Sequence, residues 1–182
     1  SSDAWAVGVA GTVLRWTGRD WAFVSGTSVH LSGVWGSGPE DVWIVGEGGT
    51  ALHWDGHDLA PTATGTTRNL FDVWGSGARD VWAVGPQGTA LHWDGQRWSS
   101  TETPADVDLT AVWSASPRQA WAVGWNAGTG IILRWDGMRW SQAPSPIPPG
   151  RSLFGVRGTS ARNVWAVGAR GTILRWNGAS WS

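Results

Sequence analysis

Several residue types are missing from this chain of 182 residues, which contains no cysteine, no tyrosine and no lysine, and only one methionine and three phenylalanines. Without cysteine, a disulfide framework and a thiolate metal site are excluded, although export from the cell is not. Without lysine there is no Walker-type phosphate loop, so we expect the Gly-rich segment 46–49 to form a turn. Without tyrosine, a sialidase-type nucleophile is excluded.

An excess of charge of one sign is missing as well, because the formal net charge is −1. The chain therefore has no long-range field that attracts polyanions, and we expect no nucleic-acid partner. The longest apolar runs are only a few residues long, and the first residues show no signal-peptide pattern. We expect no membrane insertion.

Tryptophan and glycine are abundant, with 18 and 27 residues. A central tryptophan recurs in five similar segments: DAWAVG at Asp3, DVWIVG at Asp41, DVWAVG at Asp80, QAWAVG at Gln119 and NVWAVG at Asn163. Successive copies of this tryptophan are 38, 39, 39 and 44 residues apart. The chain is therefore a five-fold tandem repeat of a supersecondary unit.

Each unit predicts four short strands, which we name A to D. In the third unit strand A covers 70–74, strand B 80–85 and strand C 89–93, and strand D begins near Trp98. These Val-, Trp- and Leu-rich runs are separated by Gly, Asp and Ser, as strands are by tight turns. Strand B is apolar at successive positions, which indicates that both faces of each sheet are covered.

This pattern predicts an all-β, five-bladed β-propeller with four strands per blade, because each blade is then covered by its neighbours. A β-solenoid is the alternative, but its repeats are usually shorter. We expect one domain, 1–182, with repeats at approximately 1–30 (partial), 31–69, 70–108, 109–152 and 153–182. The first unit lacks strand A, so we expect either self-association or closure by a strand from elsewhere.

Seventeen of the 18 tryptophans fall in four repeat columns: Trp35, Trp74 and Trp113 on strand A; Trp5, Trp43, Trp82, Trp121 and Trp165 on B; Trp16, Trp54, Trp93, Trp135 and Trp176 on C; Trp21, Trp98, Trp140 and Trp181 on D. A large apolar side chain that every blade needs is better explained by packing between blades than by ligand contact. We expect most of these tryptophans to be buried.

The segments WAVGPQGTALHWDGQRWSS, from Trp82, and VWGSGPEDVWIVGEGGTALHWDG, from Val34, resemble the Trp-rich propeller repeats of secreted proteins from GC-rich bacteria such as myxobacteria. The resemblance spans the chain and implies a bacterial, extracellular or cell-surface propeller. More loosely, the repeats are similar to tectonin-type and other propeller lectins, which implies carbohydrate binding. The Gly-His element of WD40 repeats is absent, so the WD of HWDG does not indicate that family.

Acidic residues and histidines recur at positions that predict structural roles. Aspartates recur at the A-to-B and C-to-D turns, where they cap backbone amides: Asp41 and Asp80; Asp55, Asp94 and Asp136. A facing pair of catalytic carboxylates is not indicated. His53 and His92 share a column with arginines, which do not ligate metals. We expect no enzyme activity, no metal and no cofactor.

The units differ mainly in the B-to-C turn and in the D-to-A connection, which emerge on one face of a four-stranded meander. The fourth unit has the longest B-to-C turn, 125–129, and this turn holds the one tryptophan outside the columns. Binding residues concentrate on loops carried by rigid scaffolds. We therefore predict that ligand is bound by this face, through Trp125, Asn126, Glu47, Gln87 and Arg170. The alternative for Trp125 is packing against its own blade or the Pro-rich segment 144–149.

These observations predict a non-enzymatic binding propeller that recognises an extracellular carbohydrate or protein. A rigid indole plane suits the CH face of a sugar, and neighbouring polar side chains supply directional hydrogen bonds. The alternative is a structural or assembly module of a larger exported protein, with no small-molecule site.

Overall fold

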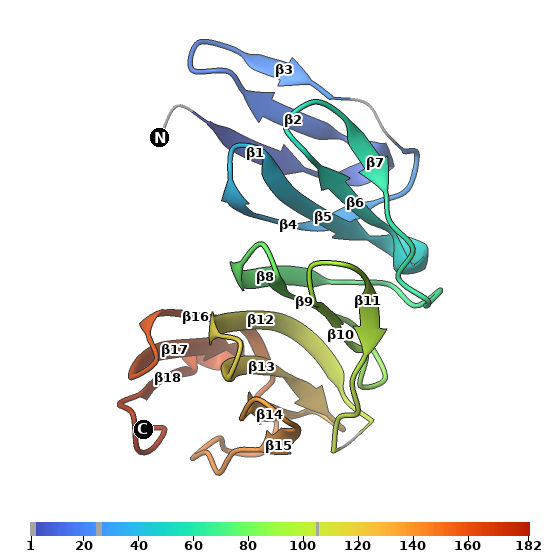
Figure 1. Cartoon of the computed structure of the whole chain (residues 1–182). Coiled ribbons are helices and arrows are strands. Elements are labelled where there is room, and N and C mark those ends of the chain that lie inside the picture. The colour runs from blue at the N-terminus through green and yellow to red at the C-terminus, as the bar shows by residue number, and fades with distance from the viewer. Residues whose placement is uncertain (1–2, 25–26, 105) are drawn as a thin grey trace.

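The computed structural model describes residues 3–24, 27–104 and 106–182, and every regular element in this part of the chain is a β-strand or a short 3₁₀ turn. The strands form five antiparallel sheets in chain order, and each sheet packs against the next along an arc (Figure 1). The predicted all-β, five-bladed propeller architecture is confirmed.

The first two sheets differ by one strand. The first has the order β1-β2-β3, with bounds Ala4–Val7, Val13–Trp16 and Trp21–Phe23. The second has the order β4-β5-β6-β7, with bounds Leu31–Gly38, Asp41–Gly46, Ala51–Trp54 and Leu59–Pro61. Strand A is therefore absent from the first sheet within the described residues, as predicted.

The third and fourth sheets also have four strands each. The third contains β8 to β11, with bounds Asp72–Gly77, Asp80–Val84, Ala90–Trp93 and Trp98–Ser100. The fourth contains β12 to β15, with bounds Asp108–Ser116, Gln119–Asn126, Thr129–Trp135 and Trp140–Gln142. The predicted strands B, C and D of the third unit match β9 to β11 within one residue, whereas β8 lies two to three residues further along the chain than the predicted strand A, 70–74.

The fifth sheet corrects one detail of the sequence-based prediction. It contains β16, β17 and β18, with bounds Leu153–Ser160, Asn163–Gly168 and Ile173–Trp176. The expected strand D is reduced here to a single bridge between Trp176 and Trp181. Two backbone hydrogen bonds between Arg175 and Ser182 support this bridge.

The hydrophobic core lies between the sheets rather than within one central layer. Four clusters of buried residues occupy the four junctions between neighbouring sheets. At the inner side of these junctions, β4, β8, β12 and β16 pack side by side. All four are strand A of their blade, so strand A forms the hub of the arc.

How deeply a tryptophan is buried depends on whether its blade has a neighbouring blade on both sides. Nine of the column tryptophans are buried: Trp43, Trp54, Trp82, Trp98, Trp113, Trp121, Trp140, Trp176 and Trp181. The expected burial is wrong for Trp21 and Trp165, which are 49% and 43% exposed. Trp21 lies on the first sheet and Trp165 on the last, so each has a neighbouring blade on only one side.

Equivalent tryptophans should therefore differ in their contribution to stability. We expect Trp82→Ala to lower the free energy of unfolding by about 3–5 kcal/mol, because Trp82 is fully buried between the third and fourth sheets. Trp165→Ala, in the same repeat column, should cost about 1–2 kcal/mol because half of its surface is already in water. Urea unfolding of both variants measures the difference, and equal losses would contradict interblade burial as the cause.

Candidate ligand-binding site

The B-to-C turns and the D-to-A connections lie on the same face of the arc, because they are hydrogen bonded to each other. Glu47 N donates to His30 O at 2.9 Å, and Ala169 N donates to Ser152 O at 2.8 Å. In the third blade Gly88 N donates to Val107 O at 2.7 Å, and Gln87 N donates to the side chain of Asp108 at 3.2 Å. The predicted shared face is therefore present.

Three of the predicted site residues lie in these turns but on different blades. Glu47 and Arg170 belong to single 3₁₀ turns, Glu47–Gly49 and Ala169–Gly171. Gln87 and Arg170 have φ angles of 54° and 55°, in the left-handed region that side chains seldom adopt. The turn geometry thus sets their conformation. The structure places these three residues on the second, third and fifth blades and does not gather them into one pocket.

The fourth blade requires a correction, because Trp125 does not lie in an expanded turn. It is part of β13, where it is paired with Asp108 of β12 and Gly130 of β14. Asn126 ends the strand, and Ala127 and Gly128, both with positive φ, close the hairpin. The three added residues lengthen two strands, and Trp125 remains 36% exposed on this extension.

A cavity of about 460 Å³ lies at the hub, and the sequence analysis did not predict it. It is lined by residues of strand A in the last four blades and of strand B in the last: Ser32, Phe71, Asp72, Thr110, Ala111, Phe154, Gly155, Val156, Arg157, Trp165 and Val167. Phe154 and Val167 are 57% and 46% exposed, so apolar surface faces solvent here.

Arg157 makes the main polar contacts of this cavity. Its Nη1 donates to Asp72 Oδ2 at 3.1 Å and its Nη2 to Oδ1 at 3.3 Å, across 85 positions of sequence. Nη1 also donates to Val112 O at 2.9 Å, and the guanidinium lies 4.4 Å from the ring centroid of Trp74. One side chain of the fifth blade thus contacts the third and fourth, while 49% of it remains exposed.

One feature of the sequence, the residue at the tryptophan position of strand A, could have indicated this cavity. Strand A carries tryptophan at Trp35, Trp74 and Trp113, but arginine at Arg157. The connections are therefore not the only place where the units differ. A departure from the repeat within a strand is equally informative, because the fold does not require it.

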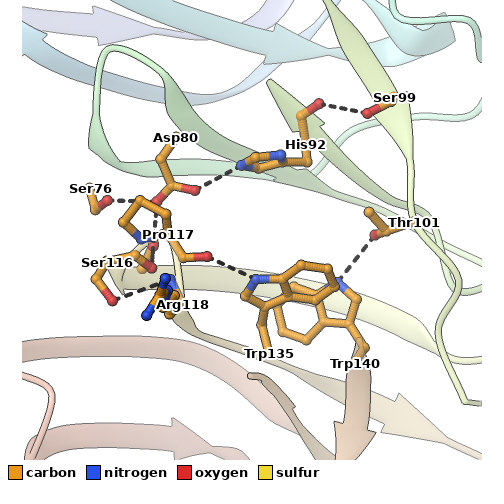
Figure 2. Close-up of polar contacts among 11 residues, drawn as sticks. Ser76, Asp80, His92, Ser99, Thr101, Ser116, Pro117, Arg118, Trp135 and Trp140 are labelled. Carbon is orange, nitrogen blue, oxygen red and sulfur yellow. Dashed lines mark hydrogen bonds and ion pairs between the residues drawn. The ribbon is translucent and has the colours of Figure 1, made fainter. Parts of the chain in front are cut away.

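A second polar cluster joins the strand-A serine, the strand-B aspartate and the strand-C histidine (Figure 2). Ser76 Oγ donates to Asp80 Oδ2 at 2.6 Å, and His92 Nε2 lies 2.8 Å from Asp80 Oδ1. Ser114 of the next blade also donates to Asp80. The aspartate lies between serine and histidine, so the histidine is not placed as a base for the serine. The cluster fastens strands together.

This cluster makes stability depend on pH. Burial opposes ionisation of Asp80, but hydrogen bonds from His92, Ser76 and Ser114 outweigh it and hold the pKa of the Asp80 carboxyl below its ordinary value. Backbone amides lower the pKa of the C-to-D turn aspartates in the same direction: Asp55, Asp94 and Asp136. A lowered pKa stabilises the fold above the unfolded-state pKa, and this stabilisation is lost as pH falls through the folded-state pKa.

We therefore expect the free energy of unfolding to be nearly constant between pH 7 and about pH 5, and to fall below about pH 4. Asp80→Asn should lower stability at neutral pH and flatten the acid decline. Urea unfolding at several pH values tests both effects. An acid decline of unchanged steepness in the variant would show that Asp80 does not contribute to it.

Membrane-spanning helices and metal clusters are two further features to consider in the described residues. Within 3–24, 27–104 and 106–182, no helix has the length and apolarity to cross a membrane. The same ranges contain no cluster of three or more His, Cys, Asp or Glu side chains arranged to hold a metal ion.

Comparisons with known proteins show the fold of the chain. No family model and no curated protein matches it. Among solved structures it is similar to YCF48 from Cyanidioschyzon merolae, with 16% identity and a TM-score of 0.73 over 97% of this chain and 66% of that one. It is also similar to U3-55K, with 12% identity and a TM-score of 0.78 over 99% of this chain and 59% of the other.

The WD40 β-propeller domain of Doa1 is 14% identical, with a TM-score of 0.78 over 98% of this chain and 62% of that chain. The chain thus spans about 59 to 66% of these similar structures. Identities this low show a shared architecture alone. Together with the five sheets, they establish that this chain has the β-propeller fold.

Proposed function

We propose that this chain is a non-enzymatic protein-interaction module, and that the hub cavity binds an exposed segment of a partner protein. The observation that carries the proposal is the combination of exposed aromatic surface with a half-exposed arginine in one cavity. Phe154 and Trp165 supply the apolar surface, and Arg157 supplies the polar contact.

The chemistry of this cavity suits a peptide better than a small polar metabolite. Aromatic and arginine side chains are enriched at the energetic centres of protein interfaces. The guanidinium can donate to a backbone carbonyl or a carboxylate, and such charge-assisted bonds are stronger than neutral ones. Asp72 holds Arg157 in place, so little side-chain entropy is lost on binding. The expected ligand is an extended segment with an apolar or aromatic side chain and a nearby acceptor.

One comparison supports this proposal. A solved structure titled YCF48 bound to D1 peptide is 14% identical to this chain, with a TM-score of 0.51 over 99% of this chain and 76% of that one. That protein is a similar structure whose title names a bound peptide. The extracellular or cell-surface location and the bacterial source implied by the sequence resemblance belong to this proposal as well.

Carbohydrate binding is a second candidate, and a different surface favours it. Trp125 presents an indole that is 36% exposed on the extension of β13 and β14, next to the exposed Asn126. An indole plane beside an amide matches the apolar face and the hydroxyls of a sugar.

A library of random 12-residue peptides, selected on the immobilised full chain, tests the hub cavity. We expect enriched peptides to combine an aromatic or aliphatic residue with an acidic one. Phe154→Asp should weaken a selected peptide at least tenfold, because it places charge in the apolar surface. Met138→Asp is the matched control, since Met138 is 88% exposed on another blade and outside the cavity. Selection of peptides that bind both variants equally would contradict the proposal.

A glycan array with the same protein tests the second candidate. If carbohydrate is bound through β13, Trp125→Ala should reduce affinity by about 1–3 kcal/mol while the free energy of unfolding changes little. If Trp125 serves packing, stability should fall instead and affinity for a bound glycan should be unchanged.

A further inference from the structure

A groove of about 500 Å³ lies between β1 and β4, apart from the hub cavity. It is lined by Asp3 and Trp5 on one side and by residues of the second sheet on the other: Val34, Trp35, Gly36, Ser37, Gly38, Pro39 and Val42. In the other sheets strand B is paired on both sides, as β9 is with β8 and β10. In the described part of the first sheet, β1 is paired with β2 alone.

The open edge of β1 presents backbone groups in the pattern that the other blades use for strand A. Gly8 N donates to Thr12 O on the β2 side, and backbone groups alternate along a strand, so Trp5 and Val7 turn theirs to the open edge. Val84, the equivalent of Val7 in the third blade, accepts a 2.7 Å hydrogen bond from Phe71 N. An added strand would meet the same acceptor at Val7.

The groove also contains a glycine against which a tryptophan ring can pack. In two other junctions the strand-A tryptophan lies against a glycine of the next inner strand. A Cβ atom at Gly75 would lie 2.5 Å from Cη2 of Trp35, and one at Gly158 would lie 2.7 Å from Cη2 of Trp113. Gly36 occupies the same repeat position on β4, but the nearest atoms to a Cβ there come from its own hairpin.

We propose that this groove is a strand-binding site, whose ligand is an extended peptide with the strand-A pattern L-x-x-V-W-G-S-G. The peptide adds to the free edge of β1 by antiparallel pairing, and its tryptophan lies on Gly36, as Trp35 lies on Gly75. Main-chain hydrogen bonds then supply affinity and the tryptophan supplies specificity. The internal junctions of the chain show both elements in place, and the site is independent of the hub cavity.

A synthetic peptide with the sequence RNLFDVWGSGAR, which is residues 68–79 of this chain, provides the probe. Labelled peptide is titrated against the full chain, and fluorescence anisotropy reports binding. We expect saturable binding with one peptide per chain. The matched peptide in which the tryptophan is replaced by alanine should bind at least tenfold more weakly.

A proline substitution on β1 tests whether the peptide pairs with the free edge of this strand. Val7→Pro removes an amide that faces the open side, and proline is tolerated in an edge strand at such positions. Peptide binding should be lost while the thermal unfolding midpoint changes by only a few degrees. Val9→Pro is the control, because Val9 lies in the turn Val9–Gly11, beyond the end of β1, and is 67% exposed.

Hydrogen exchange of the unmodified chain gives a measurement that does not depend on a variant. Added peptide should protect the amides of Trp5 and Val7, and should not change the exchange of Trp21 and Phe23. Val24 N donates to Val13 O on the β2 side, so the amides of Trp21 and Phe23 face the opposite edge of this sheet. Absence of saturable binding, equal binding of both peptides, or protection at β3 instead of β1 would overturn the proposal.

Discussion

The contact on which the structure depends is the packing of one strand-B tryptophan against two tryptophans of the following blade. Trp82 lies 4.8 Å from Trp135 and 4.9 Å from Trp140 between ring centroids, and Trp121 has the same relation to Trp176 and Trp181. Each indole buries on the order of 200 Å², equivalent to about 5 kcal/mol of transfer free energy. The buried Nε1 atoms of Trp82 and Trp121 have no hydrogen-bond partner among the described residues, so apolar burial and ring geometry account for the contact.

The same contact explains why histidine and arginine exchange in one column. His53 stacks 4.3 Å from Trp43, while Arg134 lies 5.6 Å from both Trp121 and Trp176. An imidazole ring and a guanidinium are both flat groups that pack against an indole face. Both can also reach a polar side chain near the start of strand B, as His53 reaches Asp41 and Arg175 reaches Asn163. The column therefore conserves shape and hydrogen bonding rather than a charge.

How much of this could be predicted from the sequence depends on whether the repeat carries the information. The strands, the turns and the missing strand A of the first blade follow from columns that recur in every unit. The exposure of Trp165 could not be predicted in this way. A repeat column indicates that a side chain packs against the next blade, but it does not indicate whether a next blade is present. The sequence predicts a loop at Trp125, whereas the structure has a strand there, because an insertion in a turn and an extension of two paired strands add the same number of residues.

The hub cavity was missed for a different reason. Arg157 pairs with Asp72 across 85 positions, and no local pattern links the two residues. Only the curvature of the arc, which results from all the interblade contacts together, brings strand A of the third and fifth blades close enough for this ion pair. A site that depends on curvature is visible only in three dimensions.

The exposed outer faces of the first and last sheets have a consequence for how such a chain evolves. Because the buried residues of each core cluster belong to one pair of neighbouring blades, a unit gained at an end of the arc creates one junction and leaves the existing core clusters as they were. The last sheet ends with Trp165 on a face that the tryptophans of another unit would fit, so a gained copy meets a surface already suited to it. The number of blades can therefore change in single genetic steps, without the coordinated substitutions that a shared central core would demand.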